Sequence, residues 1–348
     1  MNKNNIRARA QTTGRATRRA LLAGAAGATS FVILRWPANA AQFTYKLGHD
    51  QPVSHPQNVR AVEAAANITK ESGGRLTVEV FPNNQLGGDT QMLAQLRSGA
   101  LELLQIGDNI LANVVPSASV AGIPFAYKDY DQLWSTLDGE LGRYIHAQIE
   151  KAGLHVFDKA WDAGFRQVFT SDHAVNAPAD MKGLKLRVPE APIQLSTFRA
   201  FGTSPTPINN SELYTALQTH LVDGAEQPLV SIESARYYEV TKYITMTRHQ
   251  PTPFEMLANG NAWRRLPPDL QEILSRNLNE SALRERSDVA HGEVALQAHL
   301  KTQGQAIIEP DHAAFQNVIR SAGLYAQWRD TYGAEPFALL EKSVGKLT

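Results

Sequence analysis

The hydrophobic pattern of the chain begins with two strands on either side of a helix. Apolar residues alternate with polar ones through 43–47 and again through 76–80, and a period of two residues is typical of strands. Between these runs, residues 58–72 place apolar side chains at helical spacing and are followed by Gly73-Gly74, a pair that ends helices. We therefore predict a β-α-β unit.

The same alternation continues along most of the chain. Further strands are expected at 101–106, 154–159 and 184–188, and helices at 90–98, between 129 and 151, at 192–201 and at 212–219. Strands separated by helices indicate a mostly parallel sheet. About 308 residues follow residue 40, more than the size at which one hydrophobic core usually stops growing. We expect two α/β lobes.

The segment 267–303 is too long for a helix of one small lobe. It has one glycine, Gly292, no proline beyond its start, and apolar residues at helical intervals. At 1.5 Å per residue a continuous helix here would be about 50 Å long, against about 30 Å for a small domain. We expect it to lie across both lobes, with a kink into two helices near Gly292 as the alternative.

The first 40 residues have the layout of an export signal. Residues 1–19 carry six basic side chains and no acidic one, and an apolar run at 20–34 is followed by a small-x-small cleavage site. The run of about 15 residues is shorter than the roughly 20 needed to cross a bilayer. We predict that 1–40 is cleaved and that the mature protein is periplasmic, without insertion into the membrane. Arg18-Arg19 favours the twin-arginine route, and an ordinary secretory signal is the alternative.

The charge balance argues against nucleic acid as a partner. The 348-residue chain has 34 basic and 34 acidic residues, but seven of the basic ones lie in the first 40. The mature chain therefore has 27 basic and 34 acidic residues, a net charge of −7, and lacks the basic surface that phosphates require. The sequence contains no cysteine, so no disulfide or thiolate metal site supports the fold.

Candidate chemistry is concentrated at the predicted strand 184–188. This strand follows a turn and ends at Pro189, with Arg187 on the face opposite its apolar residues. Arg187 thus stands near the carboxyl end of a strand, where ligands lie in open α/β sheets. The rigid guanidinium fork binds carboxylates through two charge-assisted hydrogen bonds. From residue type alone, a surface arginine in a salt bridge is the alternative.

The stretch around Arg187 resembles the signature of the solute receptors of tripartite ATP-independent periplasmic (TRAP) transporters, of the dicarboxylate-binding type. The order and spacing of several further motifs extend this resemblance over nearly the whole mature chain, at 46–49, 85–89, 161–166, 180–189, 211–218, 222–228 and 237–240. The resemblance implies an α/β fold built as a two-lobed periplasmic-binding-protein clamp. Each lobe would be a mostly parallel sheet flanked by helices, and the long helix would cross both.

The resemblance assigns ligand contacts to three side chains of the second lobe. It implies that Arg187 makes the defining salt bridge to the ligand carboxylate and that Arg166 is a second contact; a structural salt bridge at the hinge is the alternative for Arg166. Gln227 occupies the place of a family asparagine that closes on the carboxylate from the opposite side. Glutamine donates the same amide hydrogens from one methylene further out, so a contact there requires a re-spaced pocket.

Five more residues match pocket positions of the family. Asp89 matches an acidic position that reads ligand hydroxyls, although a helix N-cap is the alternative. Asn210, Glu190, His49 and Asp108 match pocket-proximal positions, with helix capping as the alternative for Asn210 and a structural loop histidine for His49. Several polar acceptors facing two arginines suit a sugar acid better than a plain aliphatic acid.

The implied mechanism is closure of two lobes on a small carboxylate. We predict that 41–163 and 253–290 form lobe I, that 164–252 and 291–348 form lobe II, and that the closed protein delivers its ligand to the TRAP membrane subunits. A receptor of the same fold that reports to a membrane sensor kinase is the alternative.

An enzyme is the less supported interpretation of the sequence. The chain has no nucleophile elbow, phosphate-binding glycine loop or His-Glu-x-x-His motif. His49, Asp50 and His55 are the closest approach to a metal-binding set, and they lack another obvious ligand. We therefore expect no catalytic residues, no metal and no cofactor.

Overall fold

The computed structural model describes residues 41–348, so the export signal predicted at 1–40 lies outside the described residues. Across 41–348, none of the helices combines the length and the apolar character that spanning a membrane would require.

The predicted β-α-β unit is present at the start of the described chain. Strand β1 (Phe43–Gly48) pairs in parallel with β2 (Leu76–Phe81), and α1 (Pro56–Glu71) connects them. The helix begins two residues earlier than its apolar pattern indicated, because the ring of His55 caps it by accepting a hydrogen bond from the Gln57 amide. Pro56 then occupies the first turn, where its missing N–H costs nothing.

The strands form one mixed sheet in the order β2-β1-β3-β9-β5-β8-β6-β7. Two groups of parallel strands, β2-β1-β3 and β8-β6-β7, lie at its ends. The long strands β9 and β5 join these two parallel groups through antiparallel pairs. The short strands β4 and β10 both pair with β9. The remaining bounds are β3 Leu103–Gly107, β4 Leu154–Val156, β5 Trp161–Thr170, β6 Lys185–Val188, β7 Ser204–Pro207, β8 Gly224–Pro228, β9 Tyr243–Asn259 and β10 Ala306–Ile308.

Strands β5 and β9 were not predicted, because their sequences carry no alternation. All ten residues of β5 are buried, as are all but two of the 17 in β9. Because both faces of these strands are covered, neither face is marked by exposed polar residues, and the period of two is lost. The β5–β9 register shifts between Asp162 and Phe165, where Gly164 has a φ of +97° that other residues rarely adopt. The lobe boundary predicted at 163 falls in this irregular stretch.

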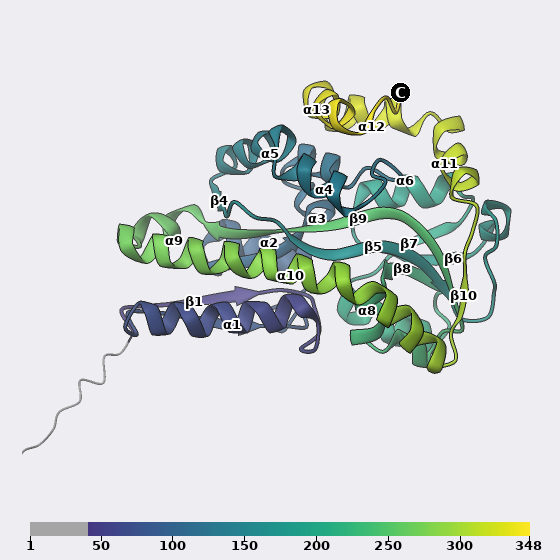
Figure 1. Ribbon diagram of the computed structural model, residues 1–348. Helices are drawn as coiled ribbons and strands as arrows, with labels where there is room; N and C mark the ends of the chain where they lie inside the picture. The colour runs from purple at the N-terminus through teal and green to yellow at the C-terminus, as the bar shows by residue number, and fades with distance from the viewer. Residues whose placement is uncertain (1–40) are drawn as a thin grey trace, which may run out of the picture. The chain divides into compact units, whose positions relative to one another are not determined.

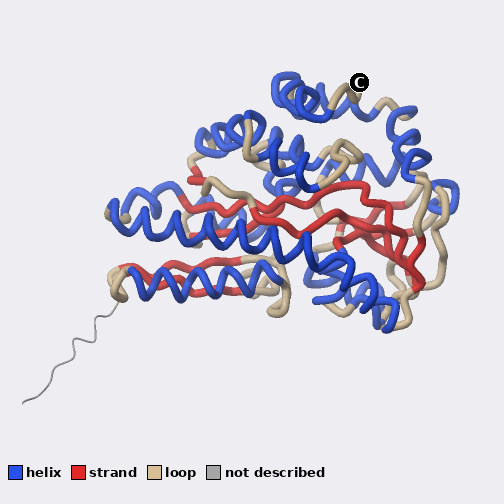
Figure 2. Tube along the Cα trace, in the orientation of Figure 1, coloured by secondary structure: helices blue, strands red, loops and turns tan. Residues whose placement is uncertain are grey.

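Helices cover the sheet on both sides (Figures 1 and 2). Their bounds are α2 Asp89–Ser98, α3 Asp108–Leu111, α4 Tyr130–Leu137, α5 Glu140–Lys151, α6 Pro192–Ala200, α7 Leu213–Gln218, α8 Leu229–Ser234, α9 Gly260–Arg265, α10 Pro268–Thr302, α11 His312–Ser321, α12 Leu324–Tyr332 and α13 Ala334–Val344. Short 3-10 turns occur at η1 Pro116–Gly122, η2 Pro178–Met181, η3 Asn210–Glu212 and η4 Tyr237–Glu239. The helices predicted from periodicity at 90–98, 192–201 and 212–219 correspond to α2, α6 and α7, and those between 129 and 151 to α4 and α5.

Helix α10 is continuous through all 35 of its residues, Gly292 included. It packs on α1 near its start and on α8 further along (Figure 1). Its first half contributes to an apolar cluster around Ile68 and its end to a second cluster around Leu217. A third cluster, around Phe198, joins α2 to α6 with the C-terminal helices. The long helix therefore belongs to the hydrophobic cores of both parallel groups.

Candidate functional site

Arg187 is held inside the protein by a single hydrogen bond to the backbone. Its side chain is 1% exposed, and its Nε donates to the carbonyl oxygen of Ile208 at 2.8 Å. Its Nη1 is buried and has no hydrogen-bond partner within residues 41–348, and the guanidinium forms no ion pair with any of them. Burial lowers the pKa of Arg187. The surface salt bridge considered from residue type alone is therefore wrong.

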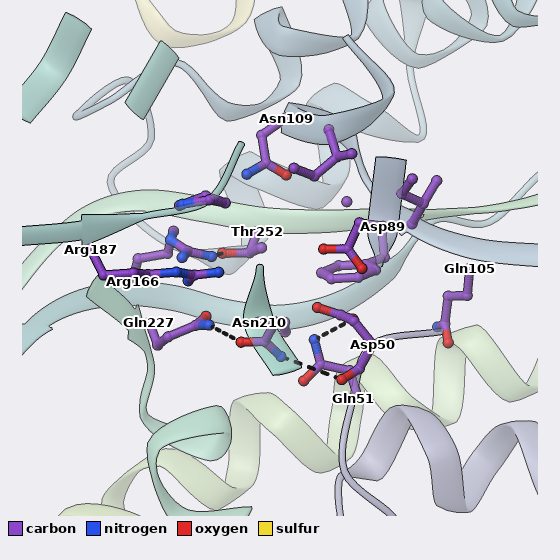
Figure 3. A pocket seen from close by; sticks show the side chains of 16 residues that line it. Asp50, Gln51, Asp89, Gln105, Asn109, Arg166, Arg187, Asn210, Gln227 and Thr252 are labelled. Atoms are coloured by element: carbon purple, nitrogen blue, oxygen red, sulfur yellow. Dashed lines mark hydrogen bonds between the residues drawn. The ribbon is translucent and has the colours of Figure 1, made fainter. Parts of the chain in front are cut away.

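The side chain of Arg187 points into a cavity in which about 440 Å³ of space, part of it open to solvent, is unfilled by protein atoms. The cavity lies at the carboxyl ends of β1, β3, β6 and β8, and its walls come from both parallel groups of strands (Figure 3). It is lined by Asp50, Gln51, Asp89, Gln105, Ile106, Gly107, Asn109, Ile110, Ala163, Arg166, Arg187, Pro189, Asn210, Gln227, Thr252 and Phe254.

Arg166 lines the cavity and also forms a buried salt bridge. Its Nε and Nη2 both bind the carboxylate of Glu226, the latter at 2.7 Å, and Nη2 also donates to the Glu226 carbonyl at 2.7 Å. His249 Nε2 lies 3.2 Å from the same carboxylate. Burial alone would raise the pKa of Glu226, but Arg166 and His249 outweigh it and lower that pKa. The structural salt bridge considered for Arg166 is therefore present, and contact with a ligand stays a prediction for this side chain.

Asn210 links Gln227 to the opposite wall of the cavity. Gln227 Nε2 donates to Asn210 Oδ1 at 2.8 Å, and the hydroxyl of Tyr237 donates to the same oxygen at 3.2 Å. Asn210 Nδ2 in turn donates to the carbonyl of Asp50 at 3.3 Å. Capping by Asn210 is wrong, since the side chain of Asn209 caps the turn instead.

Two carboxyl groups, those of Asp89 and Asp50, lie along the cavity beyond the arginines (Figure 3). Asp89 Oδ1 accepts from Asn84 Nδ2 at 2.7 Å, and Asp50 Oδ1 accepts from Gln51 Nε2 at 3.0 Å. Asp89 is the first residue of α2 and Gly88 is its cap, so the N-cap alternative for Asp89 is wrong. Burial raises the pKa of both aspartates, and the charge of Asp89 raises that of Asp50 further, to about 8.

The raised pKa of Asp50 predicts that the ligand-free protein loses stability as the pH rises. Near neutral pH the folded protein retains a proton that the unfolded chain, with aspartate pKa values of about 3.9, has released. The contribution of Asp50 to the stability of the folded protein is fully present below the unfolded pKa and is lost as the pH rises through about 8. Differential scanning fluorimetry should show Tm falling between about pH 6.5 and 8.5, and the variant Asp50→Asn should flatten that slope.

The chosen pH window separates Asp50 from two buried histidines. Burial lowers the pKa of His49 to about 4 and that of His55 to about 3. Both groups therefore make stability rise with pH up to their unfolded value of about 6.5, and they contribute no slope above it. An Asp50→Asn variant that retained the slope of the parent protein in this window would assign the effect to another group.

Three of the eight residues expected at the site do not line this cavity. His49 is fully buried in a turn, where Nδ1 accepts from the Gln51 amide and Nε2 lies 3.3 Å from Asn58 Oδ1. These contacts are those of a structural loop histidine.

Asp108 and Glu190 also lie outside the lining of the cavity. Asp108 lines a separate small pocket together with Asn109 and Thr252, where burial and then the charge of Glu255 hold its pKa well above the usual range. Glu190 bridges two segments: its Oε2 accepts from Thr90 Oγ1 at 3.0 Å and its carbonyl accepts from Asn113 Nδ2 at 3.1 Å.

Several polar lining residues were missed by sequence reasoning. Asp50 follows His49 directly, and the motif at 46–49 drew attention to the histidine instead. Gln105 did carry a signal, because it is the one polar side chain in the apolar run 103–106. Thr252 belongs to β9, which the pattern did not predict.

Comparison with known proteins identifies the family. Residues 47–328 match the family described as "Bacterial extracellular solute-binding protein, family 7". The chain belongs to this family. Its relatives include the 2,3-diketo-L-gulonate-binding periplasmic protein of Escherichia coli, which is 30% identical over 281 residues, 80% of this chain and 85% of the relative. The sialic acid-binding periplasmic protein of Vibrio cholerae is 30% identical over 296 residues, 85% and 91% of the two chains.

Solved structures of the family confirm the two-lobed α/β fold. A TRAP periplasmic solute-binding protein from Roseobacter denitrificans with bound L-galactonate has a TM-score of 0.81 and 30% identity, covering 87% of this chain and 99% of that one. The sugar acid binding protein of Advenella mimigardefordensis in complex with galactonate has a TM-score of 0.83 and 26% identity, with 88% and 98% covered. The resemblance to TRAP receptors noted from the motifs is confirmed, and the family consists of binding proteins.

Proposed function

We propose that this protein is a periplasmic receptor that captures a small organic acid and delivers it to the membrane subunits of a TRAP transporter. The observation that carries the proposal is the buried Nη1 of Arg187, which lies at the cavity wall without a partner within residues 41–348. A ligand carboxylate supplies the missing acceptor and the missing negative charge together. The relatives and solved structures named above, several of which bind sugar acids, support the same chemistry.

The residues around the cavity support a clamp whose closure depends on the ligand. With lobe I at 41–163 and 253–290 and lobe II at 164–252 and 291–348, the bonds of Asn210 to Asp50 and of Glu190 to Thr90 cross from one lobe to the other. A ligand held by Arg187 on one side and Asp89 on the other adds contacts that exist only in the closed state. Closure then presents surfaces of both lobes together to the transporter.

The N-terminal sequence supports the location of this receptor. The six basic residues, the short apolar run and the cleavage site within 1–40 would carry the chain out of the cytoplasm, and Arg18-Arg19 favours export in the folded state. The sequence has no cysteine, so the fold needs no disulfide and is compatible with an oxidising compartment.

A thermal-shift screen of purified mature protein against a library of small organic acids tests the proposal. We expect at least one acid to raise Tm, since a ligand at 100 times its Kd stabilises the folded state by about 2.7 kcal/mol. The matching alcohol or amide, which lacks the carboxylate, should leave Tm unchanged. The proposed function would be wrong if no acid raised Tm, or if the uncharged analogues did so equally.

A further inference from the structure

The end of the cavity away from the arginines is formed by a neutral amide without a partner. Gln105 lies in β3 between Leu104 and Ile106 and is 1% exposed. Neither its Nε2 nor its Oε1 has a hydrogen-bond partner among the residues that the structure describes. A buried primary amide that bonds to nothing is strongly unfavourable, so the group calls for a polar partner inside the cavity.

Charge is distributed unevenly along the cavity. Figure 3 shows Arg166 and Arg187 at one end and Gln105 at the other, with Asp50 and Asp89 between them. These arginines are the only cationic side chains in the described lining, and Glu226 already neutralises Arg166. One carboxylate can therefore be paired, at Arg187. Towards Gln105 the cavity offers acceptors and a neutral amide, and no cation.

We propose that this site selects acids with a single carboxylate and a hydroxyl group at the far end, and that Gln105 recognises that hydroxyl. The inference rests on the proposed function, because it requires the carboxylate to be bound at Arg187. A hydroxyl donates to Oε1 of Gln105 and accepts from its Nε2, which satisfies both halves of the amide. Hydroxyls along the ligand donate to Asp50 and Asp89. The ligand class is a polyhydroxy monoacid, such as an aldonate.

A second carboxylate at the far end is disfavoured by the same geometry. It would be buried beside Asp50 and Asp89 without a cation to pair with, and Gln105 could offer it only the two hydrogens of Nε2. Protonation of the aspartates would relieve the repulsion but would not supply a positive charge. The cavity therefore discriminates between acids of equal length by the charge of the terminal group.

Aldonates and aldarates of the same configuration provide the matched test. Galactonate and galactarate, and likewise gluconate and glucarate, differ only in a terminal CH2OH that becomes a carboxylate. By isothermal titration calorimetry at neutral pH, we expect the tightest-binding aldonate to bind at least about a hundredfold more tightly than its aldarate. An aldarate or a C4-dicarboxylate that bound equally or better would overturn the inference while leaving the proposed function intact. The inference would be overturned in the same way if the best acid in the library lacked a polar far end.

Substitution of Gln105 assigns the discrimination to this residue. Gln105→Met keeps the length and apolar stem but removes both hydrogen bonds, so the aldonate should bind about tenfold more weakly. Glycerate, which occupies the carboxylate end alone, should bind as before and reports that the variant is folded.

Gln105→Lys places a cation at the far end and should reduce the difference in affinity between aldonate and aldarate. Gln327→Met on the surface of α12 is the matched control, for which no change is expected. If Gln105→Met left aldonate affinity unchanged, water would satisfy the amide and the inference would fail.

Discussion

Replacing Arg187 with lysine should weaken binding of the organic acid by at least about a hundredfold, although the positive charge is kept. The guanidinium uses Nε to hold Ile208 and leaves Nη1 for the ligand. A lysine ammonium donates from a single compact nitrogen, so it cannot place donors at the two separate positions that the planar guanidinium fork reaches. Charge-assisted hydrogen bonds contribute about 1.5 to 3 kcal/mol each, and about 1.4 kcal/mol corresponds to a tenfold change in affinity. Arg187→Ala should abolish measurable binding, since it also removes the charge.

Calorimetric titration with the acid that gives the largest thermal shift measures this effect. Arg199→Lys is the matched control, because Arg199 is an exposed arginine on α6 and should tolerate the change. Binding by Arg187→Lys within twofold of the parent protein would show that the carboxylate is held in some other way.

Replacing Glu226 with glutamine should lower the free energy of unfolding by about 3 kcal/mol or more. Glu226 is fully buried, accepts from Arg166 and lies 3.2 Å from His249. Glutamine preserves the shape of the side chain but leaves the Arg166 guanidinium buried without its counter-charge. Breaking a buried pair by removing one partner is costly for this reason, even where the intact pair contributes little net stability.

Urea denaturation of the two proteins at pH 7 without ligand gives the difference. The same substitution at an exposed pair, Glu140→Gln opposite Lys342 at 2.6 Å, should change stability far less, because water and salt screen exposed charges. Equal effects at the two sites would mean that the Arg166–Glu226 pair is solvated in the ligand-free protein.

The parts of the fold that could be predicted are those with one exposed face. The helix at 58–72 and the strands on either side of it alternate between core and solvent, so their periodicity identified them. Strands β5 and β9 join the two parallel groups and are buried on both faces, which removes the alternation. Without them the sequence indicated two sets of parallel strands but not the single mixed sheet that unites them.

The candidate site could be predicted to the level of segments rather than side chains. The motifs placed Arg187, Arg166, Asp89, Asn210 and Gln227 together, and the cavity lining contains all five. The motif indicated His49, but its neighbour Asp50 lines the cavity instead. In an extended segment, neighbouring side chains point to opposite sides. A motif marks the segment in either case, so it cannot tell which of two adjacent side chains enters the cavity.

Helix α10 gives the protein a mechanical element that connects its two halves. Because the helix is unbroken and anchored in two apolar clusters, a rotation of one half relative to the other must be absorbed as curvature along the helix shaft. Long helices bend smoothly at small cost. Gly292 lies within this shaft and lacks a side chain, and an added Cβ there would meet only a Leu296 methyl carbon at 4.0 Å. Ligand capture would then be coupled to the elastic deformation of one helix, and the stiffness of that helix would help set how readily the clamp opens again.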